Sequence, residues 1–422
     1  MKELAIAIFG ILAIFVVLQT SYVMAFVSAL FHLPTSKIIQ EELLPKAAVI
    51  LPLRYADPFL DACVRALLQQ KYPQYKLHII VDSEKDPAWN VVTQTIQQLQ
   101  ATHVQVSPLI TRYKTCSLKG SALVQAINAL DDSYEVVAFV DADVVPHSTW
   151  LRELVAPLAD KQIGATTGNR WYIPQIGQWG SLIRHLFNLG AVVSMYINKY
   201  PWGGSMAMRL SVLQQAQLLQ VWKHSISVDS PVWGALHKIG LTVKFVPAAL
   251  VSNSEECNLA QCWRFIQRQI LVSRLYHPRW RLTFSQVLTC TLILTAAIAL
   301  LPVAIVSNNF TAAAWMGGGV IGYIAAMGVL FALTEHSVRR VLRANGVSKV
   351  ESFSVLMMAK VLLAILLMQL IVTLAGISTM LKQKVEWRGA VYEIKDPYNV
   401  QLIECYQQQN PLSSVGGKTS IG

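Results

Sequence analysis

The chain has 422 residues, of which 54% are hydrophobic and only 14% are charged, and its formal net charge at pH 7 is +11. Soluble domains are about 45–50% apolar and about 25% charged, so this composition excludes a wholly soluble protein and predicts a membrane protein with a soluble part. Basic residues gather beside apolar segments, as Arg339, Arg340 and Arg343 do, which favours contact with anionic lipid over nucleic acid.

Four stretches are long and apolar enough to span a bilayer, for which about 20 residues suffice. They are residues 4–31, 284–306, 311–333 and 355–381. The first is too long for the core of a signal peptide and is not followed by a small-residue cleavage site. We therefore expect it to be an uncleaved membrane anchor.

The charges between these stretches predict their orientation. The link "SNNFT" is uncharged, whereas the expected loop 334–354 is rich in arginine. By the positive-inside rule that loop and the region 32–283 face the cytoplasm. Four spans would then leave the tail outside, although it begins with the basic segment "KQKVEWRG". Either one apolar stretch is re-entrant, or the rule fails at this end.

These observations divide the chain into five expected regions. They are a transmembrane anchor (1–31), a cytoplasmic domain (32–258), an amphipathic interfacial region (259–283), about three transmembrane helices (284–381) and a tail (382–422). The six cysteines include no CxxC pair and indicate no disulfide framework, which fits a domain that faces a reducing compartment.

The soluble region reads as strands alternating with helices. Strands are expected at 47–53, 76–82, 103–109 and 135–141, and helices at 57–70, 87–101 and 119–130. Such a series predicts an α/β fold with a mixed, mainly parallel sheet that is buried on both faces. Ligands bind at the carboxyl ends of the strands in sheets of this kind.

Acidic residues follow two of the expected strands. Asp82 ends the second, and Asp141 and Asp143 end the apolar run "VVAFV" at 136–140. Two carboxylates spaced D-x-D can point at one hard cation such as Mg²⁺ or Mn²⁺. The alternative is a polar turn in which Asp143 caps a helix at 148–158. The other strand-end acid favours the metal site, with Asp143 as the firmer ligand and Asp141 shared between the metal and a nucleotide's ribose or diphosphate.

Several motifs resemble a known family. They are "AAVILPLRYADPFLDACVRALLQQKYP", "HIIVDS", "VVAFVDADVVPHSTWL", "WGGSMAMR" and "SVDSPV", which together span roughly 45–275. Their order is similar to that of inverting GT-A glycosyltransferases of family 2, in the ceramide-glucosyltransferase-like branch that includes hopanoid-pathway enzymes. "VEWRGAVYE" (385–393) resembles an element that follows the last span in such enzymes.

The resemblance implies a GT-A nucleotide-sugar domain and a role for each matching residue. The implied donor-binding residues are Pro52, Arg54, Asp82, Lys119 and Asp141, the metal ligands for Mn²⁺ or Mg²⁺ are Asp143 and Asp141, and the general base is Asp229. A UDP-sugar is the implied donor. Asp229 has an alternative reading as the N-cap of a helix beginning "SPVWG".

On the acceptor side, the sequence matches the family's motifs in one segment and departs from them in another. The implied acceptor-side residues are Trp202, Gly203, Gly204, Ser205, Arg268 and Gln269, although the glycines can equally form a simple turn. In "RQILV", Leu271 and Val272 stand where the family motif Q/R-x-x-R-W has Arg and Trp. This departure argues against a processive polysaccharide synthase and puts the roles of Arg268 and Gln269 in doubt.

Two segments predict contact with lipid. The helix around 179–187 has one apolar face, which is either a core face or the face of a helix lying on the membrane. Residues 259–282 mix tryptophan with arginine, as interfacial segments do. We therefore expect a membrane-bound, metal-dependent inverting glycosyltransferase that moves a hexose, glucose from UDP-glucose, to a ceramide, diacylglycerol or hopanoid-type lipid. The alternatives are a processive polysaccharide synthase and a non-catalytic membrane scaffold.

Overall fold

The computed structural model describes residues 1–31, 44–174, 178–347 and 355–406. Their central element is a seven-stranded sheet in the order β3-β2-β1-β4-β7-β5-β8. Its strands are β1 (Ala47–Leu53), β2 (Tyr75–Val81), β3 (Val104–Pro108), β4 (Val136–Val140), β5 (Ile163–Thr167), β7 (Ser205–Arg209) and β8 (Thr242–Phe245). Only β7 runs antiparallel to its neighbours. The expected mixed, mainly parallel sheet is confirmed.

Helices bury both faces of this sheet, which is why β1 and β4 are continuous apolar runs. Alternate residues of β1 lie on opposite faces of the sheet and pack against different helices. Val49 and Leu51 pack with α2 (Leu60–Leu68), α3 (Pro87–Leu99) and α5 (Trp150–Val155), whereas Ile50 packs with α4 (Leu118–Asn128), α8 (Leu218–Trp222) and α9 (Ser230–Lys238). A short α7 (Leu210–Gln215) precedes α8, and a parallel pair, β6 (Arg170–Tyr172) and β9 (Val251–Asn253), lies beside the main sheet.

The helix expected at 148–158 begins later than predicted. α5 starts at Trp150 with Thr149 at its N-cap. Asp143 therefore does not cap this helix, and the polar-turn alternative for the D-x-D motif is wrong on that point.

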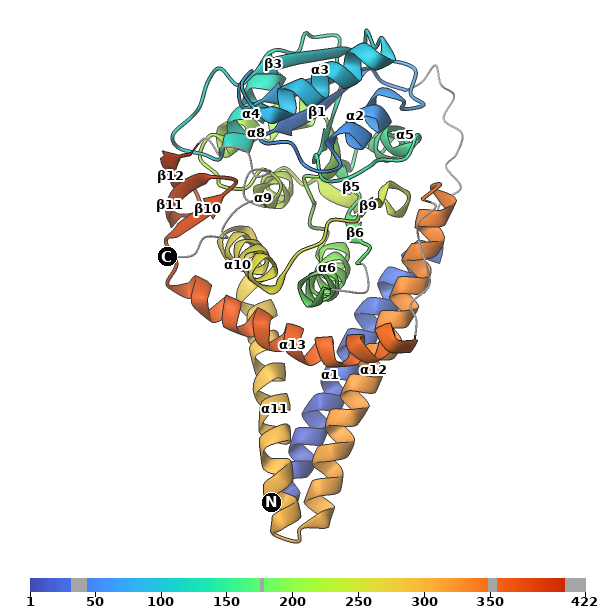
Figure 1. The fold of residues 1–422 in the computed structure, drawn as a ribbon, viewed down its shortest axis with the longest axis vertical. Helices are drawn as coiled ribbons and strands as arrows, with labels where there is room; N and C mark the ends of the chain where they lie inside the picture. Colours follow the sequence, from blue (N-terminus) through green and yellow to red (C-terminus); the bar gives the residue numbers. More distant parts are fainter. Residues whose placement is uncertain (32–43, 175–177, 348–354, 407–422) are drawn as a thin grey trace, which may run out of the picture.

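Among the described residues, four helices are long and apolar enough to cross a membrane. They are α1 (Lys2–Phe31), α11 (Trp280–Val306), α12 (Phe310–Ala344) and α13 (Val355–Met380). Figure 1 shows α1, α11 and α12 running together away from the sheet, with α13 crossing their upper end.

The sequence predicts a loop at 334–354, but α12 continues as a helix up to Ala344. The prediction is therefore wrong for residues 334–344. Val338, Val341 and Leu342 of this extension pack against Trp171 and the end of α1. Glu335 accepts hydrogen bonds from Trp171 in β6 and from His185, at 3.1 and 3.0 Å. The last turns of α12 thus fasten the long helices to the domain.

Three helices lie between the main sheet and the long bundle. α6 (Trp179–Asn198) and α10 (Leu259–Tyr276) lie under the sheet, and α13 packs across both. The apolar face of α6, including Leu182, Ile183 and Leu186, is buried against α10 and α13. Of its two readings, the core face is correct, and α13 is the element that covers it.

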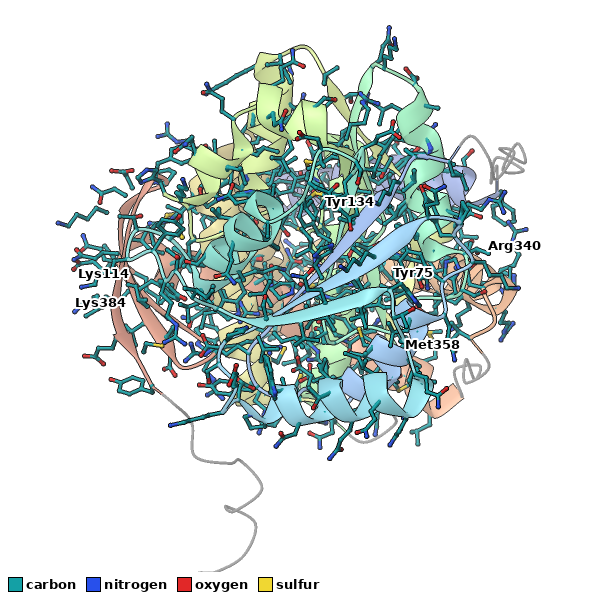
Figure 2. All side chains as sticks on the ribbon, turned by 90° about the horizontal axis from the view of Figure 1, so that it is seen from above. Tyr75, Lys114, Tyr134, Arg340, Met358 and Lys384 are labelled. Atoms are coloured by element: carbon teal, nitrogen blue, oxygen red, sulfur yellow. The ribbon has the colours of Figure 1, made fainter. Side chains whose placement is uncertain are left out.

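The chain after α13 returns to the α/β domain. It forms an antiparallel sheet of β10 (Lys384–Trp387), β11 (Ala390–Asp396) and β12 (Asn399–Cys405). Leu402 of β12 donates its N–H to the carbonyl of Lys114 at 2.7 Å, and Figure 2 shows Lys114 and Lys384 at the same edge of the molecule. The described part of the tail therefore lies on the domain side, not at the far end of the bundle.

Candidate active site

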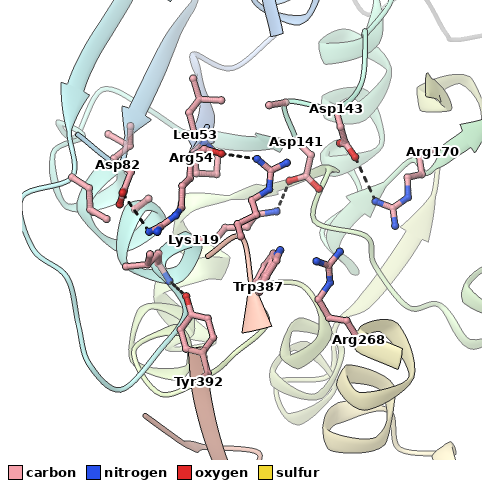
Figure 3. Close-up of a pocket in the computed structure, with 17 residues that line it drawn as sticks. Leu53, Arg54, Asp82, Lys119, Asp141, Asp143, Arg170, Arg268, Trp387 and Tyr392 are labelled. Carbon is pink, nitrogen blue, oxygen red and sulfur yellow. Dashed lines mark hydrogen bonds and ion pairs between the residues drawn. The ribbon is translucent and has the colours of Figure 1, made fainter. Parts of the chain in front are cut away.

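The ends of three neighbouring strands form one pocket of about 130 Å³ (Figure 3). Since β1, β2 and β4 are parallel and adjacent, the residues that follow them meet at one edge of the sheet. The pocket gathers Pro52, Arg54, Asp82, Lys119, Asp141, Asp143 and Arg268 from the predicted set. It also contains Arg170, Trp387, Arg388 and Tyr392, for which the sequence predicted no role.

The strand ends β1 and β2 are joined by an ion pair. Arg54 Nη1 lies 3.3 Å from Asp82 Oδ2, and both side chains are largely buried. Arg112 contacts the other oxygen of Asp82 at 3.2 Å and donates to its backbone carbonyl at 2.7 Å. This arrangement holds a carboxylate and a guanidinium at the pocket wall, where both can contact a polar ligand.

The two acids of the D-x-D motif have different surroundings. Burial alone would raise the pKa of Asp141, but its ion pair with Lys119 outweighs burial and holds the pKa below the usual value. Burial raises the pKa of Asp143, and the charge of Asp141 raises it further. Asp143 Oδ2 accepts a hydrogen bond from Asn253 Nδ2 at 3.2 Å, and Arg170 stands 4.0 Å away.

The two acids of the D-x-D motif fit a divalent cation that takes its remaining ligands from a bound molecule. Asp143 Oδ1 is buried and accepts no hydrogen bond within the structure. In the part of the chain that the structure describes, no cluster of three or more His, Cys, Asp or Glu side chains could hold a metal by itself. Mg²⁺ is commonly bound by one or two carboxylates together with substrate phosphates, so Asp141 and Asp143 match that pattern.

Four guanidinium groups line the same pocket, those of Arg54, Arg170, Arg268 and Arg388. Arg268 makes no hydrogen bond or ion pair with any other described residue, and its contacts are cation–π contacts with Phe265 and Trp387. Burial lowers the pKa of Arg268 to about 10, and the charges of Arg170 and Arg388 add to the effect. Arg268 is half-buried and has no ion-pair partner among the described residues, so the pocket is suited to an anionic ligand.

Asp229 lies beside this pocket as the N-cap of α9. Its Oδ1 accepts hydrogen bonds from Ser230 N at 2.7 Å and Ser227 Oγ at 2.5 Å. Its Oδ2 accepts one bond, from Gly203 N at 2.8 Å. The N-cap reading is therefore correct. A carboxylate oxygen has two acceptor sites, so Oδ2 retains capacity for a further proton donor, and the two readings are compatible.

The glycines of "WGGS" bring the acids close to one another. A Cβ on Gly204 would lie 2.2 Å from the Trp202 ring and 2.7 Å from Asp141 Oδ2. A Cβ on Gly203 would lie 3.0 Å from the Cβ of Asp229. Ser205 is different, because it is fully buried in β7 and accepts a hydrogen bond from Trp150 Nε1 at 2.8 Å. Its position is in the core behind the pocket.

A second cavity, of about 520 Å³, continues from the first. The two share Lys119, Asp141, Arg170, Arg268 and Trp387. Trp202, Asp229 and Gln269 line the second cavity near the sheet. Farther away its walls come from α1, α11, α12 and α13, including Phe15, Phe284, Met327, Phe331 and Met368. The cavity thus connects the strand-end pocket with the interior of the apolar helices.

Among known proteins, the chain is similar to glycosyltransferases. A model of glycosyl transferase family 21 matches residues 8–399. The chain is 36% identical over 72 residues, 17% of its length, to a ceramide glucosyltransferase of Pyricularia oryzae. It is 21% identical over 235 residues, 52% of its length, to the probable glycosyltransferase YdaM of Bacillus subtilis. The chain spans 15% and 53% of the lengths of these two relatives.

Solved structures are more distant. The mannosyltransferase PcManGT from Pyrobaculum calidifontis, solved with GDP-Man and Mn²⁺, has a TM-score of 0.48 and 14% identity over 89% of this chain and 99% of its own. GalNAc-T7, solved with UDP, GalNAc and Mn²⁺, has a TM-score of 0.40 and 13% identity over 57% of this chain and 50% of its own.

The matched family is one of glycosyltransferases, and among the described residues the chain has four helices long and apolar enough to cross a membrane. Because the family model covers most of its length, the chain belongs to glycosyl transferase family 21. The resemblance to ceramide glucosyltransferases is therefore confirmed, and the family whose model matches is family 21 where the sequence motifs indicated family 2.

Proposed function

We propose that the protein transfers a hexose, glucose from UDP-glucose, to the hydroxyl of a membrane lipid with inversion at the anomeric carbon. One observation carries this proposal: the cavity that joins the strand-end pocket to the interior of the apolar helices. A polar donor fits the pocket, and an acceptor with acyl chains fits the cavity. Ceramide, a diacylglycerol and a hopanoid-type lipid all have the required hydroxyl and apolar body.

The pocket residues account for donor binding. Arg54 and Asp82 offer a charged pair to the uridine. The diphosphate is negatively charged and would be an ion-pair partner for Arg268. Asp141 and Asp143 would hold Mn²⁺ or Mg²⁺ on that diphosphate. When bound, the cation supplies charge neutralisation for the departing phosphate oxygen. Lys119, which pairs with Asp141, lies at the same place and adds positive charge.

The reaction needs one base and no protein nucleophile. The acceptor oxygen forms a bond to the anomeric carbon as the bond from that carbon to the diphosphate oxygen breaks. Asp229 receives the acceptor's proton at Oδ2, the oxygen with spare acceptor capacity. A single displacement of this kind inverts the anomeric configuration, and UDP leaves with the electron pair of the broken bond.

The cavity disfavours the polysaccharide-synthase alternative. A growing polysaccharide needs a path lined largely by polar groups, whereas the membrane part of the cavity is lined mainly by apolar side chains such as Met327, Leu330 and Met368. The scaffold alternative is disfavoured because Asp82, Asp143 and Asp229 all remain, each held by specific contacts.

Filling the cavity tests the acceptor assignment. Met327 lines the cavity from α12, so Met327→Trp is expected to raise the acceptor KM about tenfold, equivalent to about 1.4 kcal/mol, with UDP binding unchanged. The measurement is the initial rate of transfer to ceramide, diacylglycerol or hopanoid lipid in mixed micelles. Ile321→Trp is the matched control, because Ile321 lies on the same helix and is 70% exposed. Equal acceptor KM values for both variants would contradict the assignment.

We also propose that only α1, α11 and α12 cross the membrane and that α13 lies at the cytoplasmic surface beneath the domain. Three spans place the N-terminus and the α11–α12 link outside, and the domain and the C-terminal sheet inside. This arrangement removes the conflict over the basic tail, because the tail and the arginines of α12 then face the same side.

A thiol-labelling experiment tests this orientation. Cys405 is the exposed cysteine, and the other five are buried. A membrane-impermeant reagent is expected to label Ser307→Cys, in the α11–α12 link, in intact cells, and to label Cys405 only after the membrane is opened. Labelling of Cys405 in intact cells would show that the orientation is reversed.

A further inference from the structure

The turn between β10 and β11 enters the pocket from the far end of the sequence. Trp387, which is labelled in Figure 3, and Arg388 both line the pocket. Trp387 also lines the larger cavity. Arg388 and Gly389 have left-handed backbones, with φ values of 48° and 67°. Such a conformation is costly for arginine and persists where surrounding contacts fix it.

Arg388 has those contacts, and they reach the donor side. Its guanidinium donates to the backbone carbonyl of Arg54 at 2.7 Å and pairs with Asp57 at 2.8 Å. Both partners belong to the segment that follows β1. Arg388 therefore fixes the loop whose first residue, Arg54, is paired with Asp82.

Other residues of the C-terminal sheet hold the same elements. Tyr392 accepts a hydrogen bond from Leu118 N at 3.1 Å, at the start of α4 and next to Lys119. Cys405 Sγ and the carbonyl of Tyr406 accept from the guanidinium of Arg54 at 3.1 and 2.8 Å. The sheet thus contacts two of the elements that carry donor-site residues.

Trp387 contacts a third element. Its ring lies 5.2 Å from the guanidinium carbon of Arg268 on α10. Along α10 itself, Leu271 is buried in the core, and Val272 packs against it. The positions where the family motif has Arg and Trp therefore serve packing here, and an aromatic–cation pair stands beside Arg268 from another part of the chain.

We propose that Trp387 and Arg388 are positioning residues of the donor site and supply the arginine–tryptophan pair that α10 lacks. Trp387 holds Arg268 toward the diphosphate, and Arg388 holds Arg54 toward the nucleoside. The proposal rests on the proposed function, because it takes a UDP-sugar as the donor. It makes the C-terminal sheet a part of the active site and not only a cover for the domain.

UDP binding to the purified full-length protein, measured by titration calorimetry with Mn²⁺ present, tests the proposal. Arg388→Ala and Trp387→Ala are each expected to weaken UDP binding about 10- to 100-fold, the range for losing contacts to a charged group. Trp387→Phe, which keeps an aromatic face, is expected to recover most of the affinity. Arg388→Lys is expected to remain weak, since an ammonium cannot make both contacts of the guanidinium. Glu386→Ala, an exposed neighbour on β10, is the control.

The outcomes separate the proposal from the function on which it rests. If the wild type does not bind UDP, the donor assignment is wrong and the proposal falls with it. If the wild type binds UDP and both alanine variants bind equally well, only the proposal is overturned. Melting temperatures identify a variant that loses affinity by unfolding, and in that case the milder Trp387→Phe and Arg388→Lys pair decides the result.

Discussion

Asp229→Asn is expected to lower the rate of transfer by about 10³-fold or more, at the upper part of the range for removing a general base. The amide cannot take the acceptor's proton, although it has nearly the same shape as the carboxylate. UDP binding is expected to stay close to that of the wild type, because Asp229 lies beside the donor pocket and not within it. Single-turnover rates and UDP titrations measure the two quantities separately.

The N-cap role of Asp229 requires a control. Asn and Ser cap helices about as well as Asp, so Asp229→Asn and Asp229→Ser both keep the capping chemistry at α9. Both variants are expected to be inactive and to have melting temperatures near that of the wild type. Normal turnover by either one would mean that Asp229 only caps the helix, and the base would have to be sought elsewhere.

Asp143→Asn is expected to remove the effect of Mn²⁺ on donor binding and to lower transfer by at least about 10²-fold, since cation stabilisation of the leaving diphosphate contributes several kcal/mol. Asp143 Oδ1 is the buried oxygen without a partner, and the substitution removes the charge that makes it a ligand. The measurement is UDP affinity with Mn²⁺ and with a chelator, for the wild type and the variant.

The matched control for this experiment is Asp132→Asn, an exposed acid in the turn before β4. The wild type and Asp132→Asn are expected to bind UDP more tightly with Mn²⁺ than with the chelator, whereas Asp143→Asn shows no difference. If Asp143→Asn retained the full response to Mn²⁺, the D-x-D motif would not be the metal site.

The sheet and the strand-end acids were predictable because both depend on local patterns. A buried parallel strand is a short apolar run, and the residues after neighbouring parallel strands must meet at one edge. Asp82, Asp141 and Asp143 therefore lie together as expected. The N-cap at Asp229 was also readable from "SVDSPV", because an acid before Ser-Pro is a local signal.

The remaining residues of the pocket come from distant parts of the chain, and no local sequence pattern predicts that they meet. Arg170 lies in the short strand β6, and Trp387 and Arg388 come from a hairpin after the last apolar helix. The segment "VEWRG" was noticeable, but only the folded chain shows that it meets Arg54 and Arg268. Composition predicts that α13 is apolar, yet its direction is determined by packing on α6 and α10.

The central claim is tested most directly by the product of a single assay. The purified protein is incubated with labelled UDP-glucose, Mn²⁺ and ceramide, diacylglycerol or hopanoid lipid, and the organic extract is analysed by mass spectrometry and NMR. The predicted result is a lipid that carries one glucose in the β configuration, inverted from the α-linked donor. A polymer, an α-linked product, or no labelled lipid with any acceptor or other UDP-hexose would contradict the account.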